Sequence, residues 1–260
     1  MRILDTPDIP DWHRLAEDWR RHIPPPRPVA RTIPEQIADD LGAALVAGQY
    51  GDGERLPEQE LADAFRVSRG PVREALRLLE RRGLVSVVPR RGAQARGVTL
   101  AAIADLFNVR TALCALGARQ AALVGEQAYC DTLERRIEDM QSHEEDDSLA
   151  VRFATDTSRA ARTVVAASHN VPAIQLMAEL SEQTVWRVIW TYPLDYRTRQ
   201  RRLEHKSLYR QLHGALLAGD PDAAEHYMRR TLESTRDSAI ETLSKLRGEQ
   251  VPADRLPHTA

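Results

Sequence analysis

The sequence predicts a mainly α-helical protein in which a winged helix-turn-helix domain precedes an all-α, six-helix bundle. Three observations support this fold class. Apolar residues recur with a helical period from residue 32 onward, two short β-type segments follow the third helix, and no strand signal occurs after residue 99. With 260 residues, the chain is long enough for two modest domains.

The first domain is predicted from a series of short amphipathic segments. The apolar residues of its first helix recur every four positions, at Ile33, Ile37, Leu41 and Leu45. The elements that follow are a short strand at 55–56, helices over 58–65 and 69–82, and strands over 84–88 and 93–98. This order is that of a winged helix-turn-helix.

The second domain is predicted to be entirely helical. Helical periodicity occurs in six segments, over about 99–125, 127–144, 147–169, 172–191, 196–219 and 221–247. The expected division is an extension with a proline-rich linker (1–30), a winged helix-turn-helix domain (31–98), an all-helical domain (99–248) and a flexible tail (249–260). The extension reads either as a surface helix or as an interaction arm.

The composition is that of a soluble cytoplasmic protein. Hydrophobic residues make up 42% of the chain and charged residues 28%. The two cysteines, Cys114 and Cys130, are too few for a disulfide framework and too far apart for a zinc knuckle. No uninterrupted apolar run approaches the roughly 18–20 residues that cross a bilayer. The first residues lack the apolar stretch of a signal peptide.

The charge distribution is more informative than the net charge of −2. Residues 66–96 contain nine arginines and two acidic residues, a local excess of +7, so the rest of the chain is acidic. A local basic surface on an otherwise acidic protein is typical of a domain that binds the phosphate backbone of a nucleic acid.

The predicted helix over 69–82 carries part of this charge in an ordered row. Arg69, Arg73 and Arg77 lie four residues apart, on the face opposite the apolar residues. In a helix-turn-helix, the second helix enters the major groove with its N-terminus first. The residues predicted to lie closest to DNA are therefore Ser68, Arg69, Gly70 and Arg73. The alternative is that these arginines form a solvated face or ion pairs within the chain.

The predicted hairpin supplies a second basic element. Arg90, Arg91 and Gly92 form its tip, which is thin, basic and suited to the minor groove. Taken together, the row of arginines, the turn before it and the basic hairpin favour DNA binding over a surface that only contacts solvent.

A family resemblance is carried by the segment LPEQELADAFRVSRGPVREALRLLERRGLVSVV at residues 56–88. It resembles the signature of GntR-family regulators, over about residues 32–97. The resemblance implies that Arg69 and Arg73 read bases, that Ser68 and Gly70 contact the backbone, and that Gly92 is the wing-tip glycine. Gln59 stands where one branch of the family has a DNA-contacting arginine, and Arg91 is a candidate to compensate for it.

The helical region resembles the effector domain of FadR-type members, through LFNVRTALC at 106–114 and LHGALLAGDPDAA at 212–224. Many such domains bind a divalent metal with one aspartate and three histidines. Here only Asp156 matches that set. Ala160, Tyr209 and Thr231 stand at the three histidine positions. The resemblance therefore implies that the metal site is lost and that no metal or other cofactor is bound.

Two alternatives concern the histidines that remain. His205, His213 and His226 lie near the expected ligand positions but out of register. They either build a rearranged metal site with Asp156 or are ordinary surface residues.

The resemblance also implies an effector site. Arg110 matches an arginine that faces the cavity in relatives and can bind a carboxylate through two hydrogen bonds. Its usual acidic neighbour is replaced by Cys114. The other effector candidates are Asp156, Trp186, Arg187, Tyr209 and Thr231. A structural ion pair for Arg110, and core packing for the tryptophans, are the alternatives.

These predictions combine into one function. We expect a homodimeric, sequence-specific transcription repressor that binds an inverted-repeat operator and is controlled by a small effector, a carboxylate. The alternative is a regulator whose effector domain serves only as a dimerisation scaffold. The sequence contains no nucleophile elbow, phosphate loop or HExxH motif, so we expect no enzymatic activity.

Overall fold

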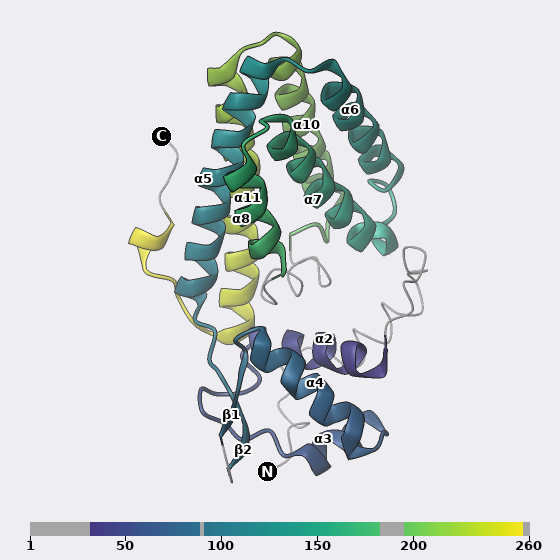
Figure 1. Cartoon of the computed structure of the whole chain (residues 1–260), viewed down its shortest axis with the longest axis vertical. Helices are drawn as coiled ribbons and strands as arrows, with labels where there is room; N and C mark the ends of the chain where they lie inside the picture. Colours follow the sequence, from purple (N-terminus) through teal and green to yellow (C-terminus); the bar gives the residue numbers. More distant parts are fainter. Residues whose placement is uncertain (1–31, 89–90, 183–194, 257–260) are drawn as a thin grey trace. The chain divides into compact units, whose positions relative to one another are not determined.

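The computed structural model describes residues 32–88, 91–182 and 195–256 (Figure 1). Within these ranges the chain is helical apart from one two-stranded sheet, which confirms the predicted mainly α fold class. The backbone forms two compact units, Met1–Thr99 with Leu246–Gly248 and Leu100–Lys245 with Glu249–Ala260. The predicted N-terminal extension lies outside the described residues.

The first unit contains the predicted helix-turn-helix elements in order. They are α2 (Ile33–Val46), α3 (Glu58–Phe65), α4 (Arg69–Arg81), β1 (Val85–Val88) and β2 (Gly92–Ala95). A capping box begins α2, where the Thr32 backbone N–H donates to the Glu35 carboxylate at 2.9 Å. Between α3 and α4, Arg66 adopts a left-handed backbone conformation with φ 56°, which reverses the chain in a short turn.

The wing is shorter than the sequence predicts. β1 and β2 pair antiparallel, and Arg55 forms a single bridge with Gln94 where a short strand was expected. The second strand stops before the end of its predicted range, 93–98. Beyond Ala95 the Arg96 backbone N–H still donates to the Leu84 carbonyl at 2.8 Å, and the Gly97 backbone N–H donates to the Asp52 carboxylate at 2.8 Å.

The core of the first unit is built on one face of α4, which packs against α2, α3 and β1. Its buried residues on α4 are Val72, Ala75, Leu76 and Leu79. Of the four periodic residues of α2, Ile37, Leu41 and Leu45 are likewise buried, whereas Ile33, at the start of the helix, is exposed. Burial of one face fixes which face of α4 remains in solvent.

The second unit is the predicted helical bundle. Its helices are α5 (Leu100–Val124), α6 (Gln127–Ser142), α7 (Ala150–Ala167), α8 (Val171–Glu182), α10 (Arg199–Leu217) and α11 (Pro221–Arg247). A short 3-10 turn, Asp147–Leu149, precedes α7. The predicted fourth helix, over 172–191, corresponds to α8 as far as residue 182, and its remainder lies outside the described residues.

Helices α5 and α7 pack closely against each other. A Cβ atom placed on Gly117 of α5 would lie 3.1 Å from the Cα atom of Val165 on α7. This distance is shorter than ordinary contact between side chain and backbone. Gly117 therefore sets how closely the two helices approach.

Helix α5 is also unusually apolar for a core helix. By length and composition it could cross a membrane, with a mean hydropathy of 1.4 over 18 residues. The sequence-based prediction of no such segment was made from uninterrupted apolar runs. Helix α5 was missed because polar residues interrupt its apolar sequence. Half of this window is buried inside the structure, and the charged Arg110 lies on its buried side. Both features are typical of a core helix in a globular domain.

The chain after α11 differs from the predicted flexible tail over 249–260. Ala253–Arg255 forms a short 3-10 helix. The Arg255 guanidinium pairs with Asp105 at 3.1 Å, and the Asn108 amide donates to the Arg255 carbonyl at 3.1 Å. These contacts hold the described part of this segment against α5.

Candidate nucleic-acid interface and effector site

The row of arginines on α4 lies in solvent, as the helical period predicts. Arg69, Arg73 and Arg77 are all exposed, while the apolar face of the same helix is buried. More than half of the side-chain surface of Arg69 and Arg73 is accessible, at 57% and 55%. The side chains can therefore reach a ligand outside the chain.

Glu58, at the start of α3, contacts two of these arginines and was missed by the sequence analysis. Its carboxylate accepts hydrogen bonds from Arg73 Nε at 3.1 Å and Arg73 Nη2 at 2.8 Å, and from Arg69 Nη2 at 3.1 Å. The hydrogen bonds from Arg73, followed by those from Arg69, lower the pKa of Glu58 to about 2. The carboxylate is therefore ionised at neutral pH.

The other candidates near the turn have simpler surroundings. Ser68 occupies the N-cap position of α4, but its side chain makes no capping hydrogen bond there. Gly70 is exposed, and a Cβ atom on it would meet only the Ser68 hydroxyl, at 3.9 Å. The Gln59 amide donates to Asp63 at 2.9 Å along the same helix. This contact occupies part of the hydrogen-bonding capacity of Gln59.

The wing presents Arg91 and Gly92 to solvent, whereas Arg90 lies outside the described residues. Gly92 has φ 83°, a conformation that side chains other than glycine rarely adopt, so the tip requires a glycine. The Arg55 guanidinium donates to the Arg91 carbonyl at 2.9 Å. Arg55 thus adds a basic group beside the wing that the arginine count over 66–96 does not include.

In the second unit, Arg110 is buried inside the bundle with 1% of its surface exposed. Burial lowers the pKa of its guanidinium, and Cys114, Tyr209 and Tyr196 lie close enough to act on it electrostatically. Burial also raises the pKa of the Cys114 thiol to about 11. Arg110 therefore lies inside the bundle, and its contact with an effector stays a prediction.

Tyr209 and Thr231 are both buried, and the hydroxyl group of each donates a hydrogen bond to a backbone carbonyl. The Tyr209 hydroxyl donates to the Thr157 carbonyl at 2.9 Å. The Thr231 hydroxyl donates to the carbonyl of Tyr227, one turn earlier on its own helix, at 2.7 Å. At two positions where the resemblance implies histidine in metal-binding relatives, this chain therefore has a hydroxyl that joins α10 to α7 and a hydroxyl that is bound within α11.

Asp156 is buried but has a different neighbour from the one expected. Its carboxylate contacts His143 Nδ1 at 2.7 Å and lies 3.6 Å from Arg159. Burial raises the pKa of Asp156, against the opposing effect of His143. Thr157, the next residue along α7, makes the contact with Tyr209. Asp156 is therefore bound to the end of α6 through His143, which is not among the predicted site residues.

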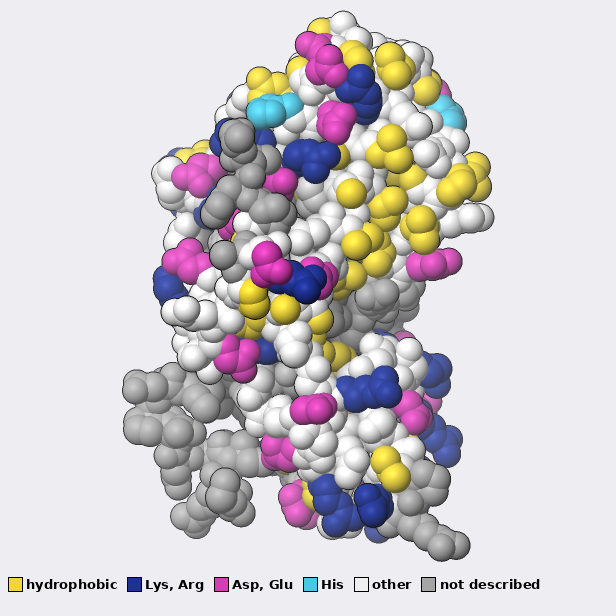
Figure 2. Space-filling model, turned by 90° about the vertical axis from the view of Figure 1, so that its left-hand side faces the viewer, with side chains coloured by type: hydrophobic (Ala, Val, Ile, Leu, Met, Phe, Trp, Pro, Cys, Tyr) yellow, Lys and Arg dark blue, Asp and Glu magenta, His cyan; other side chains and the backbone are white. Residues whose placement is uncertain are grey.

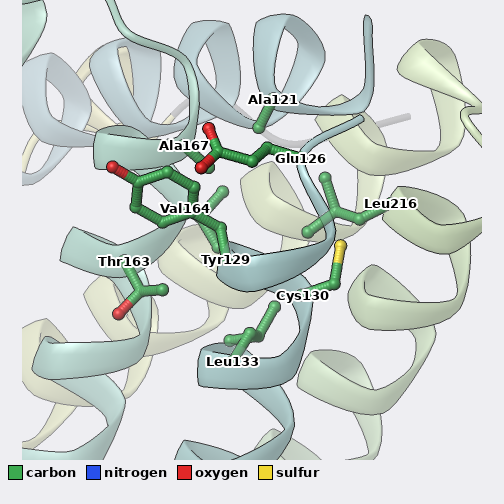
Figure 3. A pocket seen from close by; sticks show the side chains of 9 residues that line it. All are labelled: Ala121, Glu126, Tyr129, Cys130, Leu133, Thr163, Val164, Ala167 and Leu216. Carbon is green, nitrogen blue, oxygen red and sulfur yellow. The ribbon is translucent and has the colours of Figure 1, made fainter. Parts of the chain in front are cut away.

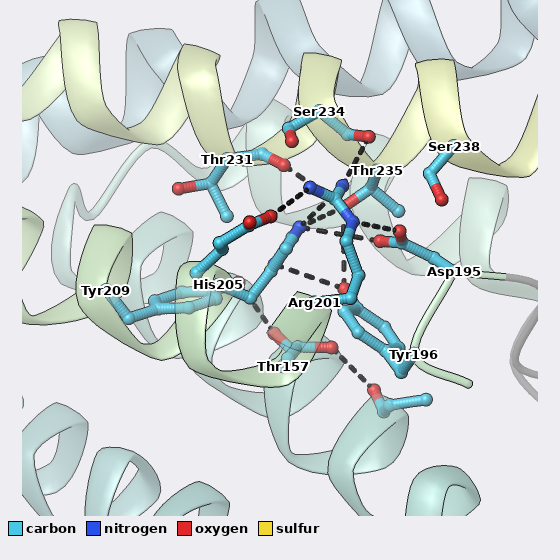
Figure 4. Close-up of polar contacts among 12 residues, drawn as sticks. Thr157, Asp195, Tyr196, Arg201, His205, Tyr209, Thr231, Ser234, Thr235 and Ser238 are labelled. Atoms are coloured by element: carbon cyan, nitrogen blue, oxygen red, sulfur yellow. Dashed lines mark hydrogen bonds and ion pairs between the residues drawn. The ribbon is translucent and has the colours of Figure 1, made fainter. Parts of the chain in front are cut away.

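His205 is the buried histidine of the three considered for a rearranged site (Figure 4). Its ring contacts Tyr196 at 3.3 Å, Thr235 at 3.2 Å and Asp195 at 3.4 Å. Arg201 joins the same cluster through Asp195, at 2.6 Å. Burial lowers the pKa of His205 to about 4, so the ring is neutral at neutral pH.

The remaining two histidines do not join this cluster. His213 is half-buried, and His226 is exposed with its ring edge-on to Tyr227. Among residues 32–88, 91–182 and 195–256, no three histidine, cysteine, aspartate or glutamate side chains are grouped to hold a metal ion. The groups around Tyr209 and Thr231 do not fit the metal of the related domains.

Buried basic residues on α10 hold the neighbouring loops in place. Arg202 donates to the carbonyls of Glu144 at 2.9 Å and Tyr196 at 2.8 Å. Lys206 forms a buried ion pair with the Glu144 carboxylate. The chain before α10 and the chain after α6 are thus joined through one helix. Trp186 and Arg187, the other effector candidates, lie outside the described residues.

A small open pocket lies elsewhere in the bundle (Figure 3). Its lining residues are Ala121, Glu126, Tyr129, Cys130, Leu133, Thr163, Val164, Ala167 and Leu216. Two of these lining residues contact His169: Glu126 at 2.8 Å, and Tyr129, whose ring lies edge-on to that of His169. None of the described effector candidates lines this pocket.

Comparison with known proteins supports this architecture. Residues 33–94 match the model of the bacterial regulatory proteins of the gntR family, and residues 105–234 match the FCD domain. The HTH-type transcriptional repressor RspR of Escherichia coli is 28% identical over 224 residues, 82% of this chain and 90% of the relative. The HTH-type transcriptional repressor NanR of Citrobacter rodentium is 27% identical over 241 residues, 80% and 86% of the two chains.

Solved structures show the same fold. Lar, described as controlling the expression of the Listeria monocytogenes agr system, matches with a TM-score of 0.63 at 18% identity, over 81% of this chain and 98% of that one. E. coli McbR/YncC matches with a TM-score of 0.54 at 21% identity, over 83% and 98%.

The chain therefore belongs to the GntR family of bacterial transcription regulators. Its helical unit is an FCD domain, which agrees with the predicted FadR-like subfamily, and the family consists of DNA-binding regulators rather than enzymes.

Proposed function

We propose that this regulator is a cytoplasmic repressor that binds an inverted-repeat operator as a homodimer and releases it when a small carboxylate binds in the FCD domain. The observation that carries the DNA-binding part is the exposed row Arg69, Arg73 and Arg77 on α4, opposite a buried apolar face. Guanidinium groups grip guanine and phosphate through paired hydrogen bonds. Names of relatives such as the repressor RspR support repression.

The remaining DNA contacts are assigned by their positions around this row. The candidates are Gln59, Ser68, Gly70, Arg90, Arg91 and Gly92. The described members among them are accessible at the turn and the wing. In this proposal Arg69 and Arg73 read bases and the others position the helix on the duplex.

Selection of bound genomic fragments tests the proposal. The wild-type protein is expected to enrich a short inverted repeat, and Arg69→Ala is expected to lose it. Arg81→Ala is the matched control, because Arg81 is an exposed arginine at the opposite end of α4. No enriched sequence with the wild type, or equal enrichment with Arg69→Ala, would contradict the proposed recognition helix.

An apolar face on the FCD domain supports the homodimer. Figure 2 shows hydrophobic side chains gathered along one face of this unit. On α5, Val109, Leu116 and Leu123 are exposed at intervals of seven residues, which places them in one row, and α8 exposes Val171 and Leu176. If the same face of a second copy packed against it, these exposed side chains of α5 and α8 would be removed from water.

Sedimentation analysis tests this face. Leu116→Glu is expected to shift the protein toward the monomer. It is also expected to weaken operator binding, because a single DNA-binding domain contacts only half of an inverted repeat. Ile33→Glu is the control, since Ile33 is an exposed apolar residue of the other unit. A Leu116→Glu protein that remains fully dimeric would exclude this face as the interface.

The effector part of the proposal depends on Arg110. Guanidinium groups bind carboxylates through paired hydrogen bonds, and this one lies buried in the bundle close to Tyr196 and Tyr209. Arg110→Ala is expected to abolish induction and to retain operator binding. Because Arg110 is part of the core, Arg110→Lys is the second variant: it keeps the charge and loses the two-point contact.

A dimerisation scaffold without an effector is the alternative. It is favoured by the Tyr209 and Thr231 hydroxyls, which are engaged with backbone carbonyls, and by the absence of a grouped metal-ligand set among the described residues. Thermal unfolding with a panel of small mono- and dicarboxylates separates the two. Stabilisation by one carboxylate that Arg110→Lys weakens supports the effector; no stabilisation by any of them supports the scaffold.

A further inference from the structure

Glu58 stands in an unusual position for an acidic residue of a DNA-binding surface. It is the first residue of α3, and its carboxylate reaches across the turn to the first and fifth residues of α4, Arg69 and Arg73. All three side chains lie on the candidate interface. A carboxylate there repels the phosphate backbone, so its presence on this surface calls for a compensating role.

The geometry of the contact leaves part of each guanidinium available. Arg73 donates to Glu58 through Nε and one hydrogen of Nη2, and Arg69 donates through Nη2 alone. A guanidinium is planar and has five N–H donors. The contact with Glu58 fixes the plane of the Arg73 guanidinium. It leaves the edge formed by Nη1 and the second hydrogen of Nη2 available, and such an edge can donate two hydrogen bonds to guanine O6 and N7.

From this arrangement we infer that Glu58 is a positioning residue, which orients Arg69 and Arg73 for base reading and so sets how well the protein discriminates its operator from other DNA. The inference rests on the proposed DNA-binding function. Long arginine side chains have many rotamers, and binding that must first order them loses free energy. A fixed carboxylate orders them in advance and offsets the repulsion between two cations one turn apart.

The same carboxylate weakens non-specific binding. Random DNA is bound through phosphates, and an ionised Glu58 reduces the net positive charge that phosphates meet. The pKa of about 2 keeps it ionised throughout the physiological range. This repulsion acts on the phosphates of operator and random DNA alike, whereas positioning strengthens operator binding alone. Positioning is therefore the effect that raises the ratio of the two affinities.

The test measures dissociation constants of the full-length dimer for the selected operator and for an unrelated duplex of equal length, at several salt concentrations. Glu58→Gln removes the charge and keeps the size of the side chain. Glu60→Gln is the matched control, because Glu60 is the other acidic residue in the first turn of α3 and is exposed. Glu58→Asp tests for partial rescue. Circular dichroism verifies that each variant is folded.

The expected result for Glu58→Gln is a roughly tenfold lower ratio of operator to non-specific affinity, the loss of part of one good base contact. Glu58→Asp should recover part of the ratio, and Glu60→Gln should leave it at the wild-type value. An unchanged ratio would overturn the inference: if both duplexes are bound more tightly by the same factor, Glu58 only repels phosphate, and if neither affinity changes, Glu58 has no role in binding. A wild-type protein that prefers no operator would instead refute the proposed function itself.

Discussion

Tyr209 on α10 and Thr157 on α7 are joined by a hydrogen bond in which the tyrosine hydroxyl donates to the threonine carbonyl at 2.9 Å. Both residues are buried, so the bond is protected from water. Tyr209 stands at a position where metal-binding relatives are expected to have a histidine. A contact between two helices thus takes the place that a shared metal ligand would hold.

The first prediction follows from this exchange. Adding Zn²⁺ or Ni²⁺ to chelator-treated protein is expected to leave the unfolding temperature unchanged, because a ligand that binds only the folded state stabilises it and no such site is expected here. Differential scanning fluorimetry across a metal titration measures this. A saturable rise in the unfolding temperature would contradict the loss of the metal site.

The second prediction concerns pH and His205. Burial lowers its pKa from 6.5 to about 4 in the folded protein. Between these values the unfolded chain binds a proton that the folded protein does not, so His205 lowers the free energy of unfolding as pH falls. The loss is complete near pH 4 and amounts to about 3 kcal/mol.

His205→Gln isolates this contribution, because glutamine does not titrate and can still bond to Thr235. Urea unfolding at about pH 7.5 and about pH 4.5 is expected to show a smaller pH dependence for the variant than for the wild type. Parallel pH profiles for the two proteins would refute the assignment of the buried neutral ring.

The third prediction compares two glycines inside helices. Gly117→Ala is expected to destabilise the protein by about 1–2 kcal/mol, since the new Cβ atom would lie 3.1 Å from both Cα and Cγ2 of Val165. Gly214→Ala should instead stabilise it by about 0.5–1 kcal/mol, because Gly214 is exposed in α10 and nothing lies within 4 Å of its added Cβ. Denaturant unfolding of both variants measures the difference, and equal effects would contradict the close α5–α7 packing.

The fourth prediction concerns salt and Arg77, the third residue of the exposed row. Arg77→Ala is expected to weaken binding to all DNA sequences and to lower the slope of log affinity against log salt by about 1, because one phosphate contact is lost. Fluorescence anisotropy at four salt concentrations gives the slope. Loss of operator preference with an unchanged slope would mean that Arg77 reads bases.

Periodicity in the sequence predicts most of the fold because each helix needs one buried face. The apolar spacing of α4 predicts both its span and the exposure of Arg69, Arg73 and Arg77. The end of β2 was predicted less well. The chain just after it contacts Asp52 through the backbone of Gly97, 45 residues away in sequence, and such distant contacts leave no local pattern.

The sites were predicted less completely than the helices for the same reason. Successive residues of a helix are rotated by about 100°, so a shift of one residue changes the face that a side chain occupies. Asp156 and Thr157 are neighbours in sequence, yet Asp156 contacts His143 and Thr157 contacts Tyr209. Glu58 meets Arg69 and Arg73 across a turn, a contact that neither helix reveals alone.

The basic surface around α4 and the wing has one chemical property that bears on its regulation. Its charge is carried by arginine alone, since the two lysines of the chain are Lys206, which is paired with Glu144, and Lys245. Acetylation neutralises lysine and leaves arginine charged. An enzyme that regulates DNA binding by acylating lysine therefore finds no substrate side chain on this surface. Chemical attachment of the protein through the amine of Lys245 would likewise leave the arginines of this surface unmodified.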